Sequence, residues 1–167
     1  NVKSSVRRAV IYSTSLGVYE LYINGTRISG DYFAPGWTDY NKRVQVQTYE
    51  VTDLLQTDKI AVGAIVGTGW YAGYVGMFGK ELYGDNPHLL LELHIEYDDG
   101  TAEKLVTDDS WKTTAGPIEY SDLLMGESYD ARKELTGWNE PDYDDSGWEK
   151  PVVMESYDGL LVAQVDP

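Results

Sequence analysis

The sequence predicts an all-β fold, either a β-sandwich or a jelly roll. Apolar and polar residues alternate along much of the chain, which is the period of a strand with one buried face. No long segment keeps the period of about 3.6 residues that an amphipathic helix shows. Short strands separated by Gly and Asn turns are typical of two packed sheets. The 167 residues suit one domain, residues 1–167, without repeat or linker.

The first strands are predicted at residues 9–13, 18–23 and 27–29. The second and third are joined by Asn24-Gly25, a strong hairpin signal because both residues tolerate a positive φ. Residues 30–41 are rich in Gly, Pro, Asp and Asn and are therefore expected to form a loop.

The middle of the chain is predicted to hold two more strands. Residues 43–49 alternate Val with Gln, whereas residues 59–66 are nearly all apolar, which is typical of a strand buried on both faces. Between them, Thr52 is expected to act as the N-cap of a single helical turn ending at Leu55. A Gly-rich loop is expected at residues 67–84.

A long strand is predicted at residues 88–97, with its hairpin partner at residues 103–107. The turn between them is Asp98-Asp99-Gly100. One face of the long strand carries Leu89, Leu91, Leu93 and Ile95 and should point into the core, while His94 falls on the other face.

The C-terminal third gives weaker signals. Residues 115–150 are expected to be loop-like, Trp148 and Pro151–Val153 are expected to mark the last core strand, and residues 160–163 are expected to form a tail.

Composition excludes several classes of function. The chain has 13 Lys and Arg against 28 Asp and Glu, so its charge of −15 disfavours nucleic acids and anionic membranes. It has no Cys, which excludes disulfides and thiolate chemistry. No stretch approaches the roughly 20 apolar residues of a membrane span. The first residues do not resemble a signal peptide and do not include an initiator Met. They suggest that the sequence was cut from within a longer chain, so the localisation of the parent protein is left undetermined.

Long, irregular motifs resemble those of one enzyme family. The chain is similar to the N-terminal module of bacterial α-L-rhamnosidases of glycoside hydrolase family 78 in five segments, which occur in the same order: GVYELYINGTRISGDYFAPGWTDYNKRVQVQTYEVTDLL, VGAIVGTGWYAG, YGDNPHLLLELHIEYDDGTAEKLVTDDSWKTTAGPI, GESYDARKELTGWN and LLVAQVDP. The resemblance covers nearly the whole chain.

The resemblance implies a β-sandwich of the galactose-binding-like kind, cut from a larger multidomain enzyme. Such enzymes remove terminal α-L-rhamnose with an inverting mechanism in a separate (α/α)6 barrel, so no catalytic residue is expected here and no organic cofactor is needed. Some relatives, in carbohydrate-binding module family 67, bind rhamnose through a calcium ion. The expected partners are a rhamnose-containing carbohydrate and the catalytic domain of the same chain.

Asp85 and Asn86 are the candidate calcium ligands, because carboxylate and amide oxygens suit a hard cation. The resemblance adds a sugar-stacking Trp about 25 residues downstream, a position that Trp111 occupies. Asn139 is a weaker candidate ligand. The alternative is that Asp-Asn-Pro is ordinary turn chemistry.

Trp70 and Tyr71 follow a Gly-X-Gly turn and could form a sugar platform. The same holds for Trp37. Alternatively, these rings plug the sandwich edge or the contact with the catalytic domain. The motif at residues 126–132 combines two acids with an arginine, and a salt bridge that orders the loop for docking explains it better than catalysis.

Two functions remain open at this point. The chain is either a non-catalytic accessory domain that binds rhamnose, or a purely structural domain that supports the catalytic barrel and binds no sugar. Hydrolysis by this chain alone is not expected, since nothing in it has the helical period of an (α/α)6 barrel.

Overall fold

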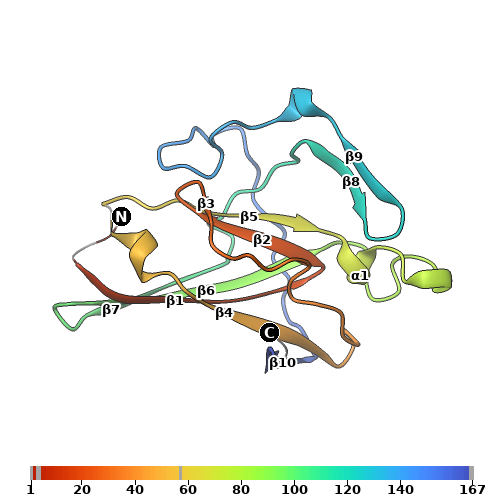
Figure 1. The fold of residues 1–167 in the computed structure, drawn as a ribbon, viewed down its shortest axis with the longest axis horizontal. Coiled ribbons are helices and arrows are strands. Elements are labelled where there is room, and N and C mark those ends of the chain that lie inside the picture. Colours follow the sequence, from red (N-terminus) through yellow and green to blue (C-terminus); the bar gives the residue numbers. More distant parts are fainter. Residues whose placement is uncertain (1, 3–4, 57, 166–167) are drawn as a thin grey trace.

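The computed structural model describes residues 2, 5–56 and 58–165, and it confirms the all-β prediction. Its larger sheet has the strand order β10-β4-β1-β6-β7 and forms one layer of a sandwich (Figure 1). Neighbouring strands are antiparallel except β10, which runs parallel to β4. The bounds are β1 (Val6–Leu16), β4 (Arg43–Glu50), β6 (His88–Tyr97), β7 (Ala102–Val106) and β10 (Leu160–Ala163).

The second layer is a sheet of order β3-β2-β5, and a β8–β9 hairpin lies beyond it (Figure 1). The strands are β2 (Val18–Ile23), β3 (Thr26–Arg27), β5 (Val62–Gly67), β8 (Ile118–Asp122) and β9 (Gly126–Tyr129). Helical turns are short: η1 (Thr52–Leu55), α1 (Gly69–Ala72), η2 (Gly76–Phe78) and η3 (Ala131–Lys133). Among the described residues, no helix is both long and apolar enough to cross a lipid bilayer.

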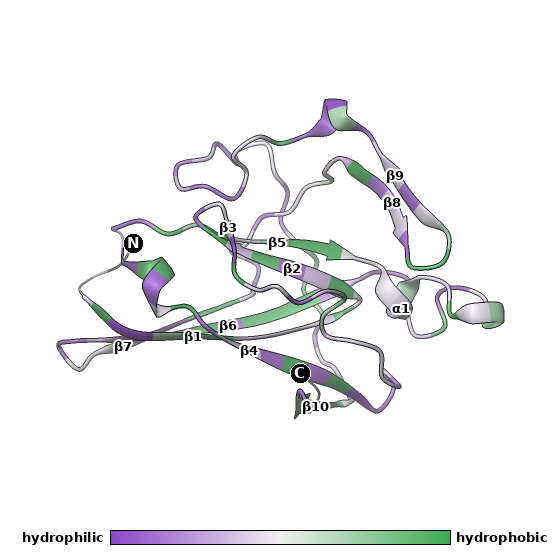
Figure 2. Cartoon of the chain, viewed as in Figure 1, coloured by the Kyte–Doolittle hydropathy of each residue, from purple (hydrophilic) through white to green (hydrophobic). Residues whose placement is uncertain are grey.

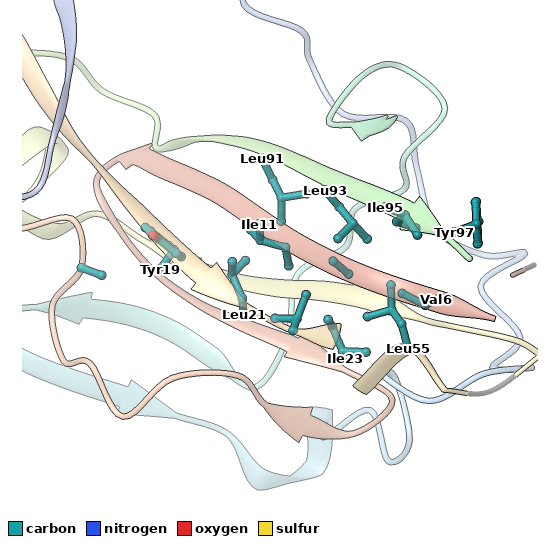
Figure 3. Close-up of a cluster of buried hydrophobic side chains, with 13 residues drawn as sticks. Val6, Ile11, Tyr19, Leu21, Ile23, Leu55, Leu91, Leu93, Ile95 and Tyr97 are labelled. Carbon is teal, nitrogen blue, oxygen red and sulfur yellow. The ribbon is translucent and has the colours of Figure 1, made fainter. Parts of the chain in front are cut away.

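The core lies between the two layers. Leu91, Leu93 and Ile95 point from β6 toward Leu21 and Ile23 of β2 (Figure 3). This confirms the predicted inward face of the long strand, because every second residue of a strand points to the same side. His94 is on the outer face as predicted, where it pairs with Glu92.

A buried tyrosine fixes the loop at residues 30–41 to the core. The Tyr19 hydroxyl contacts the Ser13 carbonyl oxygen at 3.2 Å and the Gln47 Oε1 at 2.8 Å. In turn, the Gln47 amide donates to the Pro35 carbonyl oxygen at 3.3 Å. Burial raises the pKa of Tyr19, so its hydroxyl stays neutral and able to donate.

Two predictions for the middle of the chain were wrong in detail. The apolar strand begins at Val62 and lies at the end of its three-stranded sheet, so Ile65 is 38% exposed rather than buried. Thr52 does not cap η1, because its Oγ1 accepts a hydrogen bond from the Ala9 amide and donates to the Glu50 carboxylate. Thr52 therefore ties η1 to strand β1 instead.

The C-terminal third differs most from the prediction. The segment expected to be a loop contains the β8–β9 hairpin. Pro151–Val153 is not a core strand, and Val152 is 88% exposed. The expected tail is strand β10, whose Leu161 pairs with Val44 of β4. The chain thus crosses the molecule after β9 to complete the larger sheet.

Candidate functional site

An open groove of about 1400 Å³ runs along the side of the sandwich. One wall is the edge strand β5, and another comes from β6. The segment at residues 138–157 forms much of the remaining wall. Asn86 and Trp111 both line this groove.

Trp111 is held rigidly where the groove meets the core. Its indole Nε1 donates to the Val106 carbonyl oxygen at 2.8 Å, and its ring packs against the core cluster. The indole N–H is therefore not available to a ligand, and the ring can offer only an exposed part of its face. Trp111 therefore anchors its segment to the end of β7 and lines the groove with the rest of its ring.

Asp85 and Asn86 lie exposed in the loop that leads into β6. This loop, residues 83–87, is called the YGDNP loop below. It packs against α1, because the backbone of Gly84 comes so close to the Tyr71 hydroxyl that a Cβ there would lie 2.3 Å away. Burial, together with the negative charge of Asp85, raises the pKa of Tyr71. The Tyr71 ring of α1 is thus an immediate neighbour of this loop.

The other ring of α1, Trp70, belongs to an aromatic group at the same end. Its ring is nearly parallel to that of Trp37, with 6.4 Å between centroids and 14° between planes, and Phe33 meets it edge-on. Trp37 is 53% exposed. Parallel rings with an open face are suited to contact the apolar face of a sugar.

A cluster of tyrosines packs between the loops at this end of the sandwich. Tyr40 is buried and meets Tyr71 and Tyr83 edge-on, at 5.5 and 5.1 Å between centroids. The Tyr157 hydroxyl donates to the Tyr40 carbonyl oxygen at 2.6 Å. Burial raises the pKa of Tyr157, with smaller effects from Tyr71 and Asp39. The cluster therefore holds both the YGDNP loop and α1 in place.

Asn139 lies far from the other candidate ligands. Its carbonyl oxygen accepts from the Gly25 amide at 2.9 Å, whereas Pro87 lies next to Gly17. These contacts are at opposite ends of β2, whose six residues span about 20 Å. Two ligands of one calcium ion lie within about 5 Å of each other. The structure therefore does not bring Asn139 together with Asp85 and Asn86.

The motif at residues 126–132 forms the salt bridge that its sequence predicts. Arg132 donates twice to Asp130, with its Nε 2.8 Å from Oδ1 and its Nη2 2.7 Å from Oδ2. The guanidinium is the main cause that lowers the pKa of the Asp130 carboxyl. Asp130 also caps η3 through the Arg132 amide. These contacts order the end of the β8–β9 hairpin.

Comparison with known proteins identifies the family. Residues 4–167 match the model of the α-L-rhamnosidase N-terminal domain. This chain belongs to the α-L-rhamnosidase N-terminal domain family. It is 52% identical over 165 residues to an α-L-rhamnosidase of Streptomyces avermitilis and 40% identical over 164 residues to one of Alteromonas sp.. These alignments cover 96% and 97% of this chain but only 16% and 18% of the relatives.

Solved α-L-rhamnosidases contain the same fold as this N-terminal domain. The Streptomyces avermitilis enzyme, crystallised with L-rhamnose, superposes with a TM-score of 0.95 at 48% identity, covering 99% of this chain and 16% of that one. The enzyme from Dictyoglumus thermophilum gives 0.91 at 43% identity, covering 99% and 18%. The α-L-rhamnosidase N-terminal domain thus occupies about a sixth of the longer proteins.

Sequence analysis did not identify one acidic residue near the candidate site of this α-L-rhamnosidase N-terminal domain. Asp39 lies close enough to Tyr157 to influence its pKa, and Tyr157 in turn lies close to Tyr71. Its carboxylate pairs with Lys42 at 2.9 Å and accepts from the Asn41 amide. The signal available was Asp39-Tyr40-Asn41 in a turn-rich loop, and only the tyrosine cluster shows that this loop meets the YGDNP loop.

Proposed function

We propose that this chain is a non-catalytic accessory domain of a larger α-L-rhamnosidase, and that it binds rhamnose-containing carbohydrate at the end of the sandwich that carries the YGDNP loop. The supporting observation is the packing of this loop against α1. The exposed pair Asp85 and Asn86 thereby lies in a loop that packs on the ring of Tyr71, and Trp70 is the next residue along α1. Sugar recognition needs both parts: polar groups for the hydroxyls and a flat ring for the apolar face.

Calcium fits the chemistry of this pair. A carboxylate and an amide oxygen are ligands that calcium prefers, and both side chains are exposed. In the proposal, Asp85 and Asn86 hold the ion and the ion attracts sugar hydroxyls. Trp70 and Tyr71 then exclude water from one side of the sugar and orient it.

The first test is a calorimetric titration of L-rhamnose into the 167-residue protein, with calcium and then with a chelator. We expect binding that depends on calcium and is lost in Asn86→Ala, because the exposed Asn86 side chain can be removed without disturbing the core. Asn41→Ala, in the neighbouring loop, is the matched control. Absence of heat with millimolar sugar in either condition would favour a purely structural domain. Rhamnose release from an aryl rhamnoside would contradict the non-catalytic role.

A second prediction separates the two candidate platforms. Trp70→Ala is expected to weaken rhamnose binding by about 1–3 kcal/mol, the usual loss of an aromatic anchor. Trp111→Phe keeps a ring against the core but loses the hydrogen bond to Val106, so it should lower the free energy of unfolding and leave the affinity unchanged. Titrations of both variants, after their fold is checked by circular dichroism, decide the matter. The reverse result would move the sugar into the groove beside Trp111.

A further inference from the structure

The groove beside β5 is longer than a single sugar unit requires. Its volume of about 1400 Å³ exceeds the roughly 300–1,000 Å³ of pockets that enclose one small molecule. Asn86 and Pro87 line it where Pro87 lies next to Gly17, just before β2. Glu140 lines it where its carboxylate lies against Gly25, just after β2. The groove therefore begins at the candidate rhamnose site and continues for about the length of β2, roughly 20 Å.

The backbone of β5 offers unused hydrogen-bonding groups to this groove. In an antiparallel pair, alternate residues turn their N–H and C=O groups toward the partner strand and away from it. The Asn24 amide donates to the Ala61 carbonyl oxygen, so Ala61 faces β2. By the same alternation Val62, Ala64 and Val66 face away from β2, and all three line the groove. Within the described part of the chain β5 pairs only with β2, so these outward groups have no strand to bond.

This edge also lacks the features that usually keep an edge strand unpaired. Natural edges carry charged residues, Pro or a bulge, which prevent other molecules from bonding to them. Residues 60–79 contain neither a charged residue nor Pro, although 25% of the whole chain is charged. Figure 2 shows apolar colour on β5, and its register with β2 is regular from end to end. An open edge of this kind is suited to be covered by a ligand.

Three of the five tryptophans of the chain line the same groove: Trp111, Trp138 and Trp148. Each is half-buried, so part of each ring stays open. The Trp138 ring lies so close to the backbone of β5 that a Cβ at Gly63 would be 2.5 Å from it. Trp148 meets Tyr143 edge-on, with 5.8 Å between centroids. A sugar ring presents an apolar face that suits an indole, and hydroxyls that donate and accept and so suit an open strand edge.

The charges along the groove favour a neutral ligand. The Lys59 Nζ lies 2.5 Å from the Asp142 Oδ1, and the Lys112 Nζ lies 2.6 Å from the Asp145 Oδ1. All four residues line the groove, so both lysines are already paired with acids there. Glu140 adds a further negative charge to the wall of a chain whose net charge is −15. A glycan of uronic acids would be repelled, whereas a neutral glycan would not.

We propose that this groove binds the further sugar units of a neutral oligosaccharide whose terminal rhamnose lies at the YGDNP loop. The terminal unit is that of the proposed function, on which this assignment rests, and the ligand is an extended glycan rather than a single sugar. The next units pass along β5, where their hydroxyls bond to the outward backbone groups of Val62, Ala64 and Val66. The rings of Trp138 and Trp148 cover the apolar faces of these units.

Calorimetric titration with two ligands of different length tests the proposal. L-rhamnose and a linear α-L-rhamnotetraose, which is neutral, are each titrated into the 167-residue protein with calcium present. We expect the tetraose to bind at least about tenfold more tightly, which corresponds to about 1.4 kcal/mol. Equal affinities would overturn the groove proposal and leave the rhamnose site standing. Binding of neither ligand would overturn the groove proposal and the proposed function together.

Trp148→Ala locates the added affinity. Trp148 lies in the groove wall and outside both core clusters, so its removal should leave the fold intact. The affinity for the tetraose should fall about tenfold, to that of L-rhamnose, while the affinity for L-rhamnose stays unchanged. Trp148→Phe, which keeps a ring, should retain most of the gain. Val152→Ala is the matched control, because Val152 lines the same groove and is 88% exposed. An unchanged tetraose affinity in Trp148→Ala would contradict the proposal.

Amide chemical shifts in NMR spectra show whether the edge of β5 is used. The amides of Val62, Ala64 and Val66 should shift when the tetraose is added but not when L-rhamnose is added, because only the longer ligand reaches β5. Shifts confined to the YGDNP loop with both ligands would show that the groove stays empty, and the proposal would be wrong.

An extended peptide is the competing occupant, because peptides also add to an open sheet edge as a further strand. A soluble peptide that alternates Val and Thr is the probe for this case. The three outward amides of β5 should not respond to it. If the peptide shifts these amides while the tetraose does not, the edge binds peptide and the groove proposal fails. The titration with L-rhamnose is independent of that result, so the proposed function is judged separately.

Discussion

Replacing Gly17 with alanine is expected to lower the free energy of unfolding by about 3 kcal/mol, because it combines two separate costs. Gly17 is the single residue that joins β1 in one sheet to β2 in the other, and its φ is +133°. Residues with a Cβ rarely adopt that backbone conformation. The added Cβ would also lie 2.4 Å from the Gly67 carbonyl oxygen, which is backbone and cannot turn aside.

Urea unfolding followed by tryptophan fluorescence measures this loss. The matched control is Gly30→Ala, since an added Cβ at Gly30 meets no heavy atom within 4 Å. That variant should stay within about 0.5 kcal/mol of the unsubstituted protein. A loss of less than 1 kcal/mol in Gly17→Ala would mean that the crossover between the sheets relaxes easily. It would then also weaken the argument that the YGDNP loop is rigidly placed, because Pro87 packs beside Gly17.

Truncating Leu93 to alanine is expected to cost about 3 kcal/mol, the typical penalty for removing a fully buried leucine. Leu93 is 0% exposed and lies opposite Ile11 of β1 in the register of the larger sheet. Figure 3 shows it pointing from β6 into the space between the layers. The cavity left by three missing carbon atoms cannot be filled, because its neighbours are held in strands on both sides.

Leu90→Ala is the control for this change, with the same chemistry on the same strand. Leu90 is 41% exposed, so its truncation should cost about 0.5 kcal/mol or less. Equal losses in the two variants would show that β6 is not anchored by its inward face, contrary to the alternation on which the fold assignment depends. Thermal unfolding by calorimetry would confirm that both variants still unfold in one transition.

The sequence alone determined the elements whose signals are local. Strand β6 was predicted with its inward residues, because a period of two over ten residues is unambiguous when one face is buried. Strand β2 was predicted with the observed bounds, since Asn24-Gly25 fixes where it ends. The family was identified from motifs that keep their order along the chain, and the comparisons confirmed it.

Tertiary structure alone decided the elements that depend on distant partners. The β8–β9 hairpin has no buried face, as β9 is exposed throughout, so it leaves no alternation to detect. Strand β10 is a strand because β4 offers it an edge more than a hundred residues earlier in the chain. In the candidate site, sequence analysis identified Asp85 and Asn86 from the chemistry of their side chains. Residue spacing along the chain does not encode which ring lies beside them or how far they lie from Asn139. The tyrosine cluster decides the first, and the length of β2 decides the second.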